Sequence, residues 1–86
     1  MPTISEFYGL KIIMRFKEKH GPHFHVEYAG DEALISIRNG QVLGGKLPGR
    51  AHRLALEWLA LHRDELMENW ENARRHKELK PIDGLE

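Results

Sequence analysis

Three of the six histidines in the chain fall within six positions, in the segment His20-Gly-Pro-His23-Phe-His25. The segment continues as Val-Glu27-Tyr, so His23 and His25 alternate with apolar residues, which is the periodicity of a β-strand. Side chains at positions i and i+2 of a strand leave the same face, roughly 7 Å apart. The two imidazoles are therefore predicted to stand side by side, with Glu27 next in the row. Because histidine titrates near neutral pH, such a row suits proton transfer, metal binding or anion contact.

Metal binding is the first of three interpretations of this row. A protein metal site needs at least three ligands, and the candidates here are His20, His23, His25 and Glu27. The chain has no cysteine, which excludes a thiolate zinc site and a disulfide framework. No cofactor is expected from the sequence as a whole, and a divalent zinc, nickel or iron ion is what this ligand set would take.

The second interpretation is contact with an anion or a nucleic acid, and the third assigns the histidines no ligand. The candidate anion contacts are Arg15, Lys17, His23, His25 and Arg38. In a catalytic version of the second interpretation, His23 and His25 act as acid and base while the cations stabilise an oxyanion or phosphate, as RNA cleavage requires. In the third, the histidines belong to a polar sheet face beside a hairpin. The residue pattern leaves all three open.

Short strands separated by turn signals must position this row. Strands are predicted at about 10–17, 23–28, 32–37 and 41–43, with a leading segment at 2–9, a helical region at about 49–75 and a tail at 77–86. Asn39-Gly40 is typical of a two-residue hairpin turn, and Gly44-Gly45 should weaken or bulge the fourth strand. We predict a single α+β domain over residues 1–86: a three- or four-stranded antiparallel meander packed on a C-terminal helix that is long, kinked or divided in two.

Alternation along the strands sorts the two faces of the predicted sheet. The apolar rows should cover the helix; they comprise Leu10, Ile12, Met14, Phe16, Phe24, Val26, Tyr28, Ala33, Ile35 and Ile37. The other face should be histidine-rich and locally basic; it comprises Arg15, Lys17, His23, His25, Glu27, Ser36 and Arg38.

The helical region has an apolar arc that changes direction. Ala51, Leu54, Ala55, Trp58, Leu59 and Leu61 share one arc, whereas the later set of Leu66, Trp70 and Ala73 is rotated by roughly 60°. Either a kink near residues 62–64 or packing of the second half against another subunit would explain the rotation. Trp58 and Trp70 are predicted core or interface anchors, and His62 a buried or interfacial histidine bonded to a backbone carbonyl. The rotated arc and Trp70 also predict a homo-oligomer.

Composition limits the function classes. Thirteen basic and thirteen acidic residues balance in a chain of 86, so nucleic-acid binding would need a local patch. No apolar run approaches the ~20 residues that span a bilayer, and no secretory signal is evident. We expect a cytoplasmic protein without a membrane partner.

Several motifs resemble those of one known family. They are Pro-Thr-Ile-Ser at 2–5, Phe7-Tyr-Gly9, Pro22-His-Phe-His-Val-Glu-Tyr28, Leu47-Pro48, Leu56-Glu-Trp58, His62-Arg63, Glu65-Leu66 and Glu68-Asn-Trp70. Together they resemble a bacterial family of small single-domain proteins, the domain of unknown function numbered 4160. The resemblance implies one half of a two-gene module, with a partner protein from a neighbouring gene. We therefore expect a protein-interaction or regulatory module, one member of a toxin–antitoxin-type pair. The alternative is a small metal-assisted or histidine-dependent hydrolase or ribonuclease that uses His23 and His25.

Overall fold

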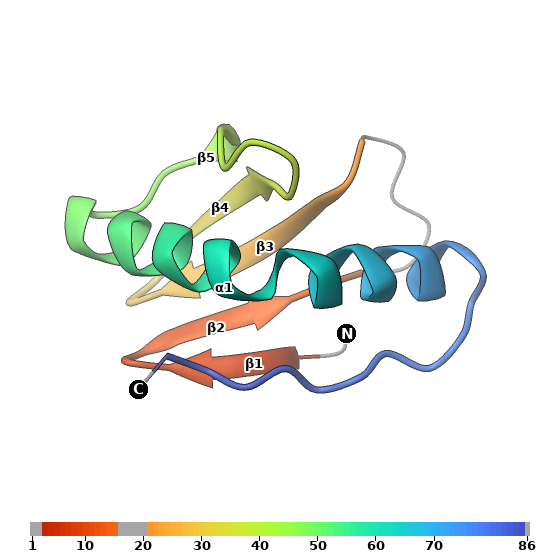
Figure 1. The fold of residues 1–86 in the computed structure, drawn as a ribbon. Coiled ribbons are helices and arrows are strands. Elements are labelled where there is room, and N and C mark those ends of the chain that lie inside the picture. The colour runs from red at the N-terminus through yellow and green to blue at the C-terminus, as the bar shows by residue number, and fades with distance from the viewer. Residues whose placement is uncertain (1–2, 16–20, 86) are drawn as a thin grey trace.

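The chain forms one antiparallel sheet with a single long helix packed across one face (Figure 1). The computed structural model describes residues 3–15 and 21–85. The strands are β1 (Thr3–Phe7), β2 (Leu10–Ile13), β3 (His23–Tyr28), β4 (Asp31–Ser36) and β5 (Val42–Gly45), followed by α1 (Gly49–Arg74). The strands lie side by side in chain order, so the predicted α+β meander with a C-terminal helix is confirmed, with one strand more than expected.

The additional strand is β1, where the sequence predicts only a leading segment. It pairs with β2 through a two-residue turn in which Tyr8 has φ 48° and Gly9 has φ 83°. Positive φ at both positions defines the turn that matches the twist of a tight hairpin. The apolar alternation of β1 is hidden because its register shifts between Thr3 and Ser5, which buries Ile4 and Ser5 together.

Two predicted boundaries were wrong. Strand β2 ends at Ile13 instead of extending to residue 17, and residues 16–20 lie outside the described part of the chain. The turn after β4 has four residues and not two, because Ser36 donates its N–H to the carbonyl of Gln41 (2.9 Å). The residue that needs glycine is Gly40, with φ 73°, where an added Cβ would lie 2.8 Å from a methyl carbon of Leu56.

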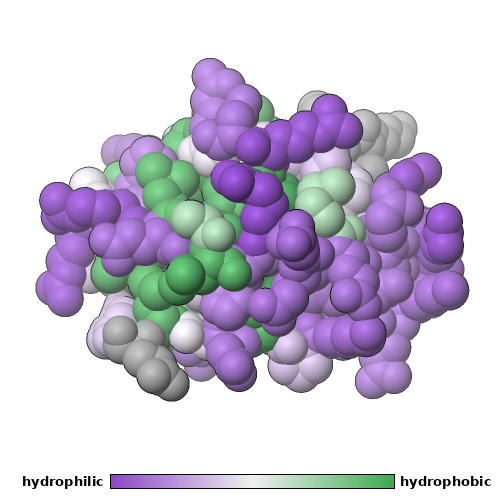
Figure 2. Space-filling model, in the orientation of Figure 1, coloured by the Kyte–Doolittle hydropathy of each residue, from purple (hydrophilic) through white to green (hydrophobic). Residues whose placement is uncertain are grey.

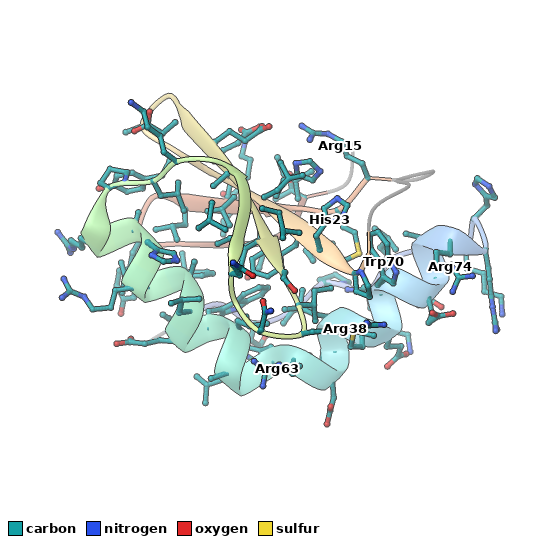
Figure 3. All side chains as sticks on the ribbon, turned by 90° about the horizontal axis from the view of Figure 1, so that it is seen from above. Arg15, His23, Arg38, Arg63, Trp70 and Arg74 are labelled. Atoms are coloured by element: carbon teal, nitrogen blue, oxygen red, sulfur yellow. The ribbon has the colours of Figure 1, made fainter. Side chains whose placement is uncertain are left out.

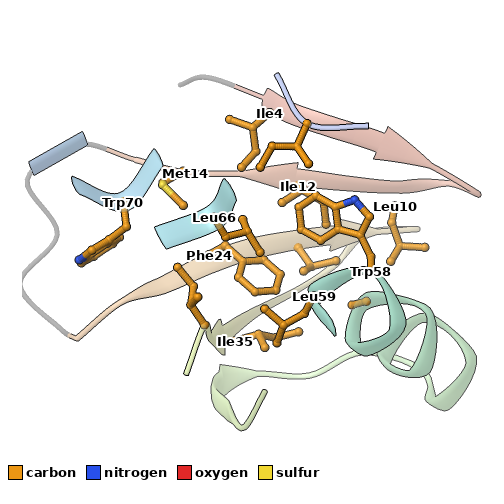
Figure 4. Close-up of a cluster of buried hydrophobic side chains, with 14 of the residues drawn as sticks. Ile4, Leu10, Ile12, Met14, Phe24, Ile35, Trp58, Leu59, Leu66 and Trp70 are labelled. Atoms are coloured by element: carbon orange, nitrogen blue, oxygen red, sulfur yellow. The ribbon is translucent and has the colours of Figure 1, made fainter. Parts of the chain in front are cut away.

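The core lies between the helix and the predicted apolar rows of the sheet (Figure 4). Ile12, Phe24 and Ile35 from three neighbouring strands are fully buried, as is Trp58 from the helix. The ring of Trp58 stacks on Phe7 at 5.5 Å and meets Phe24 edge-on at 5.8 Å. The described members of those rows are buried as predicted, except that Tyr28 is only partly buried.

The change of direction in the helical arc comes from a kink. His62 has φ −124° and ψ 22°, outside the helical range, inside an otherwise continuous helix. Leu61 is 69% exposed, so its place in the buried arc was wrong, while Leu66 and Trp70 are buried within this chain. Neither the rotated arc nor Trp70 therefore requires a second subunit, and homo-oligomerisation stays a prediction.

The segment after the helix is an ordered strap and not a loose tail. It runs back beside β1 (Figure 1), where Ile82 donates its N–H to the carbonyl of Ile4 (2.8 Å). The buried side chain of Asn69 bonds both main-chain groups of Lys80, each at 2.8 Å. The indole N–H of Trp58 donates to the carbonyl of Asp83 (2.7 Å). The strap thus closes the β1 edge of the sheet.

Candidate functional site

His23 and His25 lie side by side, but they are buried. Their exposed fractions are 1% and 5%, so the expectation of a histidine-rich surface was wrong for these two residues. Their ring centroids lie 5.4 Å apart with an angle of 71° between the planes. The ring of His23 also packs against Trp70 of the helix at 5.0 Å. Its Nδ1–H donates to the carbonyl of Gly21 (2.8 Å), because a carbonyl oxygen can only accept. His23 is thereby held between the start of β3 and the helix.

His25 belongs to a three-residue polar network. Nη1 of Arg15 lies 2.7 Å from Nδ1 of His25. A guanidinium has donors and no acceptor, so Nδ1 accepts this bond and the ring hydrogen of the neutral imidazole lies on Nε2. A carboxylate oxygen of Glu32 lies 3.5 Å from Nη2 of Arg15, and another lies 3.8 Å from Nδ1 of His25. The network Arg15–His25–Glu32 therefore ties the end of β2 to β3 and β4.

This network limits the chemistry of His25. A metal ion at Nδ1 would have to displace the guanidinium of Arg15, since the same lone pair accepts its hydrogen bond. A ring that is 5% exposed also offers little surface to a substrate. The arrangement suits a structural role, in which a buried polar group is satisfied by specific partners.

The proposed metal ligands are not gathered by the described residues. Within residues 3–15 and 21–85, no group of three or more His, Cys, Asp or Glu could hold a metal ion. Glu27 stands in a row of charged residues, opposite Lys11 of β2 and Glu32 of β4. His20 lies outside the described residues.

The proposed anion-contact set is likewise divided. Arg38 lies on the loop after β4 and not on a strand row, so its predicted place was wrong. Figure 3 shows Arg38 beside the helix and Arg15 on the opposite side of the sheet. Lys17 lies outside the described residues. The two arginines do not share a hydrogen-bond or salt-bridge partner among the described residues.

The predicted helix anchors lie in the core. Trp58 and Trp70, predicted as core or interface anchors, are 0% and 5% exposed and pack in the core of this chain. His62 is partly buried, and its ring lies 5.5 Å from that of Trp58. Its Nδ1–H donates to a carboxylate oxygen of Glu65 (2.6 Å), so the backbone carbonyl expected as its partner was wrong.

A groove beside β5 was not found by the sequence analysis. It has a volume of about 430 Å³, and its described lining consists of Gly21, Pro22, Leu34, Ser36, Arg38 and Leu43. The register of β4 against β5 shifts between Leu34 and Ile35, so Leu43 has no partner across the pair. Leu43 is 50% exposed. The bulge expected at Gly44-Gly45 was the only sequence signal for this groove. The groove also depends on the loop before β5, which carries Arg38 and which the sequence did not place correctly.

The opposite side of the molecule carries a second apolar surface. Figure 2 shows apolar side chains over the first half of α1, surrounded by hydrophilic ones. The most exposed large apolar residue there is Leu61, at 69%, while Leu54 and Leu56 pack partly against the core.

A family model described as domain of unknown function (DUF4160) matches residues 9–71, more than half of the chain. The match includes β2 to β5 and most of α1; β1 and the C-terminal strap lie outside it. No curated protein and no solved structure matches the chain. In the part of the chain that the structure describes, no helix is long and apolar enough to cross a membrane.

Proposed function

The chain belongs to the family of the domain of unknown function DUF4160, and from this premise we propose that it is a protein-interaction or regulatory module. In this proposal it acts in the cytoplasm on a partner protein encoded by a neighbouring gene, as one member of a toxin–antitoxin-type pair. The histidine pair supports the fold from inside and does not itself meet the partner.

One observation carries the proposal: the polar groups most suited to chemistry are enclosed, while apolar residues are exposed at a strand edge. His23 and His25 are nearly fully buried, whereas Val42 and Leu43 are 37% and 50% exposed. Exposed apolar residues that cluster at an edge mark interaction surfaces in small proteins. A binding role follows more directly from this distribution than a catalytic one.

The histidine-dependent hydrolase or ribonuclease receives less support. A general acid or base must come within hydrogen-bond reach of the substrate. Here Nδ1 of His23 is bonded to the carbonyl of Gly21, and Nδ1 of His25 is bonded to Arg15. Opening either ring to a substrate would require breaking contacts that hold β3 in place.

The test is co-expression of the untagged chain with an affinity-tagged product of the neighbouring gene. We expect a complex of fixed stoichiometry that survives size exclusion with light scattering at micromolar concentration. The absence of any complex for the products of both flanking genes would contradict the proposal. RNA cleavage by the purified chain that disappears in a folded His25→Asn variant, with folding checked by circular dichroism, would favour the hydrolase instead.

A further inference from the structure

The two edge strands of the sheet differ in whether another segment covers them. The outer side of β1 is covered by the strap, through the bond from Ile82 to the carbonyl of Ile4. At the other edge, β5 pairs with β4 alone among the strands that the structure describes. An uncovered edge presents backbone N–H and C=O groups that can pair with a further strand. The β5 edge is therefore the place where an additional strand can be accepted.

The bulge in β5 gives this edge a pocket for a side chain. A bulge re-aims the extra residue, and here that residue is Leu43, which lines the groove instead of facing a partner on β4. Leu34 and Pro22 supply the other apolar walls of the groove. The groove, with a volume of about 430 Å³, has room for one apolar side chain.

The rim of the groove carries one positive charge. Arg38 is the only charged residue in the described lining, and its side chain is exposed. Within residues 3–15 and 21–85 it forms no salt bridge, in contrast to Arg15 and Arg74. The loop that carries Arg38 is fixed, because Arg63 of the helix donates its Nε–H to the carbonyl of Ile37 (3.0 Å). A cation carried by an anchored loop beside an apolar groove complements a carboxylate next to an apolar side chain.

We propose that this groove receives an extended segment of the partner protein. The segment pairs with the outer edge of β5, places one apolar side chain against Leu34 and Leu43, and sets a carboxylate on Arg38. The inference rests on the proposed function and adds where the partner docks and what its contact segment looks like. Because β5 has only four residues, the added strand is short and its affinity as an isolated peptide is in the micromolar range or weaker.

The experiment selects ligands from a phage-displayed library of random linear heptapeptides on the immobilised full-length chain. We expect enrichment of β-branched or other apolar residues followed within two positions by Asp or Glu. A synthetic peptide of the enriched sequence is then titrated by fluorescence anisotropy. Leu43→Ser should weaken its binding by at least about tenfold through lost apolar contact, and Arg38→Gln by about two- to fivefold, as for an exposed ion pair.

Two exposed residues outside the groove provide matched controls. Leu61→Ser removes a leucine that is more exposed than Leu43, and Arg53→Gln removes an exposed helix arginine. Both variants should bind the peptide within about twofold of the wild type. Circular dichroism of the four variants separates a lost contact from a lost fold.

Each contrary result overturns the inference in a recognisable way. Equal binding by Leu43→Ser and wild type would place the peptide elsewhere while leaving a binding module intact. An enriched motif without an acidic residue would remove the role of Arg38. If no peptide is enriched although the chain still binds a flanking-gene product, the partner does not dock through a linear segment. If the chain self-associates and Leu43→Ser makes it monomeric, the β5 edge binds a second copy of the chain. Failure of the co-expression test as well would remove the proposed function itself.

Discussion

Replacing Asn69 by alanine should destabilise the domain because this side chain holds the strap. Asn69 is 1% exposed, and its amide both donates to the carbonyl of Lys80 and accepts from its N–H, each at 2.8 Å. Two such bonds contribute about 0.5–1.5 kcal/mol each, and truncation of a buried side chain adds a packing loss. We expect a loss of about 2–3 kcal/mol in the free energy of unfolding, or a Tm lower by roughly 10–20 °C. Urea denaturation followed by tryptophan fluorescence measures it.

An aspartate at the same position adds a second test, which is the direction in which stability changes with pH. Asn69→Asp keeps the acceptor for the N–H of Lys80 but sets a carboxylate oxygen against its carbonyl. Burial favours the protonated acid, whose O–H can donate to that carbonyl. The Asp variant should therefore regain stability relative to Asn69→Ala as the pH falls below about 5.

The control is Asn72→Ala, one turn along the helix, where the side chain is only partly buried. It should cost less than about 1 kcal/mol. Equal losses for Asn69→Ala and Asn72→Ala, or an Asp variant with no recovery in acid, would refute the reasoning that the amide of Asn69 clamps the strap.

Further substitutions test other contacts. Gly40→Ala should lower the free energy of unfolding by about 1–2 kcal/mol, because φ is 73° and the new Cβ would lie 2.8 Å from Leu56. An unchanged Tm in thermal denaturation would show that the loop has another conformation. His25→Leu should cost about 1–3 kcal/mol in urea denaturation, because it removes the Nδ1 acceptor of Arg15 from the buried end of the network. An unchanged free energy of unfolding would show that this hydrogen bond is dispensable. A hydrogen bond and the charge of Glu68 raise the pKa of Lys80 above its ordinary 10.5. The stabilisation from this ion pair is complete below pH 10.5 and is lost as the pH rises through the folded-state pKa of Lys80. The free energy of unfolding of Lys80→Met should therefore fall less steeply above pH 10.5 than that of the wild type.

The fold could be predicted from the sequence where local patterns act alone. The alternation in His23–Tyr28 predicted β3 with its observed bounds. The rotated apolar arc predicted either a kink near residues 62–64 or packing against another surface, and the structure has the kink, at His62. Strand β1 was missed because its register shift places two consecutive residues, Ile4 and Ser5, in the interior, which destroys the alternation. The strap was missed because the hydrogen bonds that hold it use its main-chain groups, for which residues such as Lys80 carry no signature. Its three apolar side chains that reach the core, Leu79, Ile82 and Leu85, follow neither strand nor helix periodicity over a sufficient length.

The position of the histidine pair could be predicted from the sequence, but its burial could not. Alternation placed His23 and His25 next to each other, as observed. It could not indicate burial, which depends on Trp70 of the distant helix and on Arg15 beyond the end of β2. Arg38 was placed on the wrong element because Asn39-Gly40 was taken for a two-residue turn.

Hydrogen–deuterium exchange of the chain, alone and in complex with its partner, tests the central claim most directly. The account predicts that slowed exchange on binding is concentrated in residues 34–45, at the edge and groove of β5, with little change around Arg15 and His25. Protection centred instead on Arg15, His25 and Glu32, with β5 unchanged, would contradict the account and return the histidine pair to the functional surface.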